Sequence, residues 1–181
     1  MGESVSILLE RISRVLIAEA HAQGLKPVQW EALRFLRRAN RFSRTPTALT
    51  RYLGCTKGTV SQTVKALEQR GLVSKRAAVG DRRSAMLELT DVGKKTLESD
   101  PLEAIDQVVA GSGMEGKLEP GLRDLLRSLL AARGMQPFGV CAGCRHFQRN
   151  GGEPHFCGLL ELPLTADDST RICVEQEPVR I

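Results

Sequence analysis

The stretch "TPTALTRYLGCTKGTVSQTVKALEQRGLVSKRAAVGDRRSAMLELT", residues 45–90, decides the fold of this chain. It opens with a short helical segment that has Thr45 as its expected N-cap and stops at Gly54. A second helical segment follows at once, capped by Thr56 and closed by Gly71. Two short helices joined by a two-residue turn predict a helix-turn-helix.

The second of these helices has an apolar stripe and a polar face. Val60, Val64 and Leu67 recur at i, i+4 and i+7, which places them on one side. Short hydroxyl and amide side chains elsewhere on the helix suit close approach to base edges, because they donate or accept hydrogen bonds within a groove. An ordinary solvated face is the alternative. The candidate DNA-contacting residues here are Thr56, Lys57, Thr59, Ser61, Gln62, Thr63 and Lys65.

A basic hairpin is expected directly after this helix. "LVSKR" (72–76) and "SAMLELT" (84–90) have strand character, and the second alternates apolar and polar residues. The tip between them ends in Arg82 and Arg83. A helix-turn-helix followed by such a hairpin predicts a winged helix, with the helix in the major groove and Arg82 or Arg83 reaching the backbone or the minor groove.

Charge is unevenly distributed along the chain. Residues 26–98 contain sixteen Lys and Arg against six Asp and Glu, a local net charge of +10, whereas the whole chain carries +5. Such segregation is typical of a module that binds a polyanion, although an unevenly charged solvated surface would look similar.

The winged-helix stretch resembles the core of MarR-type transcriptional regulators. The resemblance covers residues 26–98 and rests on the recognition helix, the "GLV" turn, the "DRR" wing tip and the "LT-x-x-G" entry to the next helix. It implies a mostly α (α+β) winged-helix fold in a homodimer that binds a pseudo-palindromic operator in double-stranded DNA. It also implies a dimer interface built from the first and last helices, within a domain spanning 1–134.

The chain offers aliphatic residues for that interface. An amphipathic helix is predicted near the N-terminus, and two more after residue 90, with Pro101 kinking or restarting the first of them. A monomer core could also bury these side chains, but a two-fold operator favours the dimer. The apolar residues are Val5, Leu8, Leu9, Ile12, Val15, Leu16, Leu102, Ile105, Val108, Val109, Leu122, Leu125, Leu126, Leu129 and Leu130.

Four of the five cysteines lie in the C-terminal extension, residues 135–181. Cys141 and Cys144 form a C-x2-C pair, while Cys157 and Cys173 stand alone. The first residues lack a signal-peptide pattern and no apolar run approaches the roughly 20 residues of a membrane span, so we expect a cytoplasmic protein. Thiols stay reduced there, which favours a four-cysteine metal or cluster site over disulfides.

The identity of the bound group is open between a [4Fe–4S] cluster and zinc. Zinc ribbons usually contribute two C-x2-C pairs, and this chain has one. The spacing resembles the small cluster-binding subunits of benzylsuccinate-synthase-type enzymes, which hold [4Fe–4S] in a fold like that of high-potential iron–sulfur proteins. Phe147 and Phe156 would shield a cluster or form the core of a zinc fold.

These features predict a regulator whose operator affinity depends on an iron–sulfur cluster in the tail. Two alternatives stay open: a regulator with structural zinc and a small-molecule effector, or an electron carrier that uses the winged helix as a scaffold for an enzyme partner. No phosphate-binding glycine loop, catalytic triad or carboxylate pair is present at a recognisable spacing, so no enzymatic activity is expected. Cys55, in the turn, is expected to act as a small buried hydrophobe.

Overall fold

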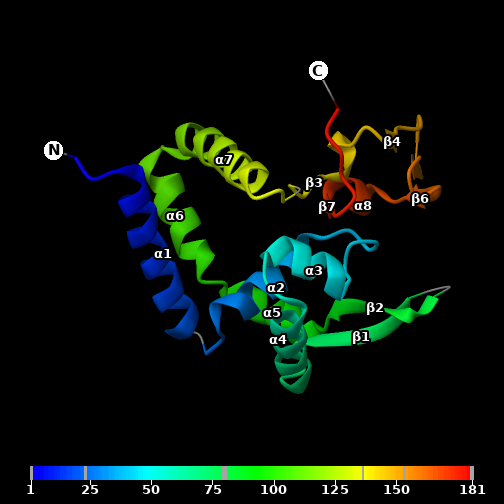
Figure 1. Cartoon of the computed structure of the whole chain (residues 1–181), viewed down its shortest axis with the longest axis horizontal. Coiled ribbons are helices and arrows are strands. Elements are labelled where there is room, and N and C mark those ends of the chain that lie inside the picture. Colours follow the sequence, from blue (N-terminus) through cyan, green and yellow to red (C-terminus); the bar gives the residue numbers. More distant parts are fainter. Residues whose placement is uncertain (1, 23, 79–80, 136, 153, 180–181) are drawn as a thin grey trace.

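The computed structural model describes residues 2–22, 24–78, 81–135, 137–152 and 154–179, with the backbone alone at 22, 78 and 81–84. Its N-terminal three-quarters is a winged helix flanked by long helices, and its C-terminal quarter is a small extension with short strands (Figure 1). The winged-helix part consists of α1 (Val5–Ala22), α2 (Pro27–Arg38), α3 (Pro46–Leu53), α4 (Lys57–Gln69), β1 (Val73–Ala78), β2 (Asp81–Leu89), α5 (Asp91–Thr96), the 3-10 turn η1 (Leu97–Ser99), α6 (Leu102–Ser112) and α7 (Glu115–Ala132).

The predicted caps set the ends of the helix-turn-helix. Thr45 accepts a hydrogen bond from the Ala48 N–H, and Thr56 accepts one from the Thr59 N–H. Between the two helices Gly54 has a φ of 62°, the left-handed conformation that glycine adopts without steric cost. The capping residues and this glycine therefore fix the turn that the sequence predicts.

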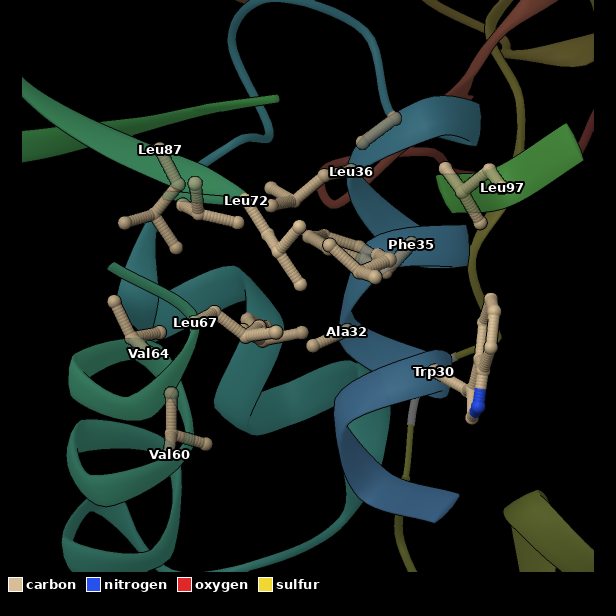
Figure 2. Packing of buried hydrophobic residues seen from close by; sticks show 14 of the residues in the cluster. Trp30, Ala32, Phe35, Leu36, Val60, Val64, Leu67, Leu72, Leu87 and Leu97 are labelled. Atoms are coloured by element: carbon tan, nitrogen blue, oxygen red, sulfur yellow. The ribbon is translucent and has the colours of Figure 1, made fainter. Parts of the chain in front are cut away.

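One hydrophobic core lies between α2, α3, α4 and the hairpin. Val60, Val64 and Leu67 of α4 face Ala32 and the other inward residues of α2 (Figure 2). Phe35 of α2 is fully buried. The reason is tertiary, because the Tyr52 and Phe138 rings pack against it with ring centres 4.8 and 5.9 Å away.

The hairpin β1–β2 is antiparallel and closes onto the next helix. Val73 pairs with Leu89 and Lys75 with Leu87, and Leu87 is buried. Gly93 of α5 lies directly under the Leu72 carbonyl, so that a Cβ on this residue would stand 2.1 Å from the Leu72 oxygen. This close approach explains why the "LT-x-x-G" entry requires a glycine.

The helices α1, α6 and α7 lie together, away from the wing (Figure 1). α6 begins after Pro101, as predicted, and neither α6 nor α7 has a buried residue in this single chain. Their large apolar side chains are exposed, for example Val108 (68%) and Leu126 (56%). Among the described helices, none has both the length and the apolar character needed to cross a bilayer.

The extension folds into short paired segments and packs against the winged helix. Ile172 is buried in the main core, with Phe138 and Val174 packed against the same core. The Arg41 guanidinium lies 3.3 Å from the Asp168 carboxylate. The extension consists of β3 (Gly139–Val140), η2 (Cys141–Gly143), β4 (Phe147–Gln148), β5 (His155–Cys157), β6 (Leu162–Leu164), α8 (Ala166–Thr170) and β7 (Ile172–Cys173).

Candidate nucleic-acid interface and cysteine site

The exposed face of α4 carries most of the expected DNA-contacting residues. The buried stripe of Val60, Val64 and Leu67 fixes the rotation of the helix, and the polar side chains consequently face outward. The exposed members of the expected set are Thr56, Lys57, Thr59, Ser61, Gln62 and Lys65. Thr63 is the exception: only 6% of it is exposed, so the structure places it on the packed side of α4 and not on the outward face.

A shallow hollow of about 230 Å³ lies where α3, α4 and β1 meet. Lys57 and Lys75 both line it, together with the hydroxyl of Ser61. Lys75 was not among the expected residues and pairs with Glu68 at 2.6 Å. Its position on β1 beside α4 depends on the strand register, and composition alone gives no sign of it. Lys75 of β1 therefore lies at the same hollow as Lys57 of α4.

The two arginines of the wing lie on β2. This strand pairs with β1, and Figure 1 shows the hairpin extending away from the helices. The side chains of Arg82 and Arg83 fall outside what the structure describes, so their expected contact with DNA stays a prediction.

Three of the four tail cysteines form one small buried cluster, and the fourth, Cys144, lies near it. Cys141, Cys157 and Cys173 are buried together with Leu164, although they come from η2, β5 and β7. Cys144 is half-buried, and its sulfur accepts a hydrogen bond from the Glu177 N–H at 3.4 Å. All four are free thiols, as is Cys55. Cysteines far apart in the sequence are thus buried in the same small cluster.

Electrostatics at Cys141 reflect this convergence. Burial, followed by the nearby Cys173, Cys157 and Cys144, raises the pKa of the Cys141 thiol to about 12. Within the described part of the chain, no three His, Cys, Asp or Glu side chains are close enough together to hold a single metal ion as they stand. The two observations are compatible, because charges interact over several ångströms whereas ligand sulfurs must lie about 2.3 Å from a shared zinc ion.

Apolar side chains surround the cysteines. Phe147 and Leu160 from the extension and Phe42 from the winged helix pack against the cluster. Phe147, one of the two expected shielding residues, also holds the His155 ring at 5.1 Å between ring centres. Phe156 is only partly buried and is not among the residues packed on the cysteines.

The remaining thiol and histidines lie as follows. Cys55 is half-buried against the main core, in agreement with the expected small hydrophobe. His146 lies at the edge of the extension, 3.5 Å from the Glu177 carboxylate. The Nδ1 atom of His155 is buried and has no hydrogen-bond partner among the described residues.

Comparison with known proteins identifies the fold of the N-terminal part. Residues 23–84 match the model of the MarR family, a segment that contains the helix-turn-helix and most of the wing. A comparison with curated proteins found no match. The match therefore agrees with the winged-helix fold of this segment.

Solved structures extend this result to the flanking helices. The S. aureus MepR–DNA complex is similar with a TM-score of 0.58 and 20% identity, over 71% of this chain and 99% of that one. CouR from Rhodococcus jostii RHA1 bound to p-coumaroyl-CoA gives 0.58 and 20%, over 70% and 92%. NadR in complex with 4-hydroxyphenylacetate gives 0.55 and 24%, over 71% and 93%. At these identities the similarity establishes a shared fold.

Proposed function

We propose that this protein is a DNA-binding transcriptional regulator of the MarR type, and that an iron–sulfur cluster held by Cys141, Cys144, Cys157 and Cys173 modulates its affinity for an operator. The observation that carries the proposal is the presence, in one chain, of a segment that matches the MarR family and of a cysteine cluster, with Cys144 near it, against which Phe42 of the winged helix packs.

The exposed face of α4 supports the DNA-binding part. Gln62 and Thr59 have the donors and acceptors for base edges, and Lys65 adds a positive charge. Lys57 and Lys75 at the neighbouring hollow suit backbone phosphates. One similar structure, MepR of S. aureus, is a complex with DNA.

The unpartnered helices support a homodimer. Apolar residues along α1, α6 and α7 are exposed in the single chain, Val5 (65%), Val108 and Leu126 among them. Exposed apolar residues gathered on neighbouring helices are typical of a surface that binds another protein. A second copy packed on these helices would bury it and would present two α4 helices to the two halves of a palindromic operator.

The chemistry of the cysteine site supports a bound metal centre. Cys141, Cys157 and Cys173 are buried together, with Phe147, Phe42 and Leu160 packed against them, and Cys144 lies near enough to act on the Cys141 thiol. Thiolates are the ligands of both iron–sulfur clusters and zinc. Leu164 is the one aliphatic residue described as buried in the extension's own cluster, since Ile172 belongs to the main core. Small units of this kind normally require a metal or disulfides for stability. When bound, the cluster would supply a redox- and oxygen-sensitive centre.

The place of the extension supports a coupling between the centre and DNA binding. The described contacts of the tail are with α2, α3 and the turn between them. Arg51 of α3 lies 3.5 Å from Glu175, and the Arg41 guanidinium donates to the Pro163 carbonyl at 2.6 Å. A change in the tail would therefore act directly on the helix-turn-helix.

The test compares operator binding by metal-loaded and metal-free protein at fixed salt. Duplexes selected from a random pool serve as the operator, and the loaded protein is prepared without oxygen. A coupling of about 1–3 kcal/mol, roughly 5- to 150-fold in affinity, is the expected difference. Equal affinities would reduce the centre to a structural element. A second titration series at several salt concentrations tests DNA binding itself, and affinity independent of salt there would contradict it.

A second candidate is a small-molecule-responsive regulator with structural zinc. CouR and NadR, both similar in fold, are bound to p-coumaroyl-CoA and 4-hydroxyphenylacetate in their structures. Visible absorption separates the two candidates. A broad band near about 400 nm in anaerobically purified protein identifies iron–sulfur chemistry, and a colourless protein with stoichiometric zinc favours the second candidate.

A further inference from the structure

Two buried polar atoms lack a hydrogen-bond partner among the described residues, and both lie in the region of the cysteine site. They are Nδ2 of Asn40, in the turn between α2 and α3, and Nδ1 of His155, two residues before Cys157. A buried N–H without an acceptor costs about 1–3 kcal/mol, so such atoms are rare and require an explanation.

The surroundings of Asn40 fix the direction of its amide. Asn40 is only 1% exposed, and its Oδ1 atom accepts a hydrogen bond from the Ser43 N–H at 3.0 Å. Because the oxygen is assigned by this bond, the NH2 group must occupy the other side of the amide. The donor without a partner is therefore a genuine N–H group.

The turn that contains Asn40 forms hydrogen bonds with Ile172 and Val174, the two neighbours of Cys173 in the sequence. The Asn40 N–H donates to the Ile172 carbonyl at 2.9 Å, and the Val174 N–H donates to the Ser43 hydroxyl at 2.9 Å. Phe42, which belongs to the same turn, packs against the cysteine cluster. Asn40 is consequently held against the segment that carries one of the four sulfurs.

We propose that the Asn40 side chain donates a hydrogen bond to the sulfur ligands of the loaded centre at Cys173. This inference rests on the proposed function, since it requires a bound metal centre. Thiolates on a metal accept hydrogen bonds, and such donors commonly change metal affinity about 10- to 100-fold. Asn40 is a positioning residue, because it acts on the centre through a ligand.

The turn that contains Asn40 is also hydrogen-bonded to strand β2 of the wing. The Leu87 N–H of β2 donates to the Arg44 carbonyl at 2.7 Å, and the Arg44 guanidinium donates to the Ala39 carbonyl at 3.0 Å. Residues 39–44 therefore contact the cysteine segment on one side and the wing on the other. Through this turn, loss of the centre would alter the support of β2, independently of the dimer helices.

The decisive variant is Asn40→Asp. It keeps the oxygen that accepts from Ser43 and replaces the donor by a second oxygen, which is repelled by a centre of net charge about −2. Protein carrying the iron–sulfur cluster is mixed with a chelator at several pH values up to about 9, because burial beside a negative centre raises the pKa of the new carboxyl group, and loss of visible absorption is followed. We expect the cluster to be lost about 10-fold faster than in the wild type. Asn150→Asp is the matched control: the same change at an exposed residue of the tail should have no effect.

Asn40→Leu supports the interpretation, because it removes the donor without adding charge. Circular dichroism of the metal-free proteins checks that both variants fold. If both variants retain the cluster as long as the wild type does, the inference about Asn40 is wrong while the proposed function stands. If the anaerobically prepared wild type contains neither iron nor zinc, the proposed function fails. In the Asn40→Asp protein, the ratio of DNA affinities with and without the centre should move toward one.

Discussion

A single buried carboxylate joins the winged helix to the start of α6. The Asp100 carboxylate accepts two short hydrogen bonds from Arg34, at 2.6 and 2.8 Å, and one from the Leu102 N–H at 3.0 Å. Its burial acts to raise the pKa, but the hydrogen bonds from Arg34 and Leu102 and the charges of Arg34 and Arg37 outweigh burial and hold the pKa below 3.8. The charged form is therefore the form that the fold stabilises.

Asp100→Asn should lower the free energy of unfolding by about 2 kcal/mol at neutral pH, because it leaves the partly buried Arg34 charge unpaired. The native pKa lies below the unfolded value, so the carboxylate's contribution is complete above about pH 3.8 and disappears as the pH falls through the native pKa. Urea unfolding of the two proteins at several pH values measures this difference. Asp106→Asn, at an exposed position of α6, is the control. A gap between variant and wild type that does not narrow in acid would contradict the assignment.

Gly93 provides a second test at this scale. Gly93→Ala should destabilise the protein by about 1–3 kcal/mol or more, because its Cβ would meet the Leu72 carbonyl oxygen at 2.1 Å. Gly116→Ala is the matched control, since nothing lies within 4 Å of a Cβ there and alanine favours the helix. Thermal unfolding compares the pair. Equal midpoints would show that α5 does not pack against Leu72 in solution.

At the scale of elements, the rotation of α4 about its own axis determines which of its side chains face solvent and can reach DNA. Val60, Val64 and Leu67 hold one side in the core and leave Gln62 and Lys65 in solvent. The spacing of apolar residues predicted this rotation. Thr63 lies three residues after Val60 and four before Leu67, so helical periodicity itself places it on the packed side. The expectation that it contacts DNA rests only on its polar side chain.

Gln62 and Lys65 should contribute to DNA binding in different ways. Gln62→Ala should cost about 1–3 kcal/mol on a selected operator and much less on random DNA, because amides read base edges. Lys65→Ala should weaken binding to both and reduce the slope of log affinity against log salt by about 1. Fluorescence anisotropy titrations at several salt concentrations measure both effects. Lys117→Ala on α7 is the control, and an equal loss from this control would argue against a specific role for α4.

At the scale of the whole molecule, the exposed apolar faces of α1, α6 and α7 require a partner. Leu122 and Leu126 of α7 are 49% and 56% exposed in the single chain. In the proposed dimer these residues are buried, and the two reading helices are held at the separation of successive major grooves.

Leu126→Glu should therefore convert the dimer to a monomer. A carboxylate in an apolar interface must be desolvated without a partner, which costs several kcal/mol. Sedimentation velocity measures the mass, and operator affinity should fall together with dimer content. Leu159→Glu, at an exposed leucine of the extension, is the control. A Leu126→Glu protein that remains dimeric would place the interface elsewhere.

The sequence by itself determined the winged helix. Thr45, Thr56 and Gly54 act through neighbouring residues, and the stripe of α4 depends only on helical periodicity, so local chemistry was sufficient for these elements. Only the tertiary structure decided where the extension lies, that Phe35 is fully buried, and that the turn containing Asn40 borders Cys173. These features depend on contacts between residues far apart in the chain, and no local pattern in the sequence encodes which distant surfaces will pack together.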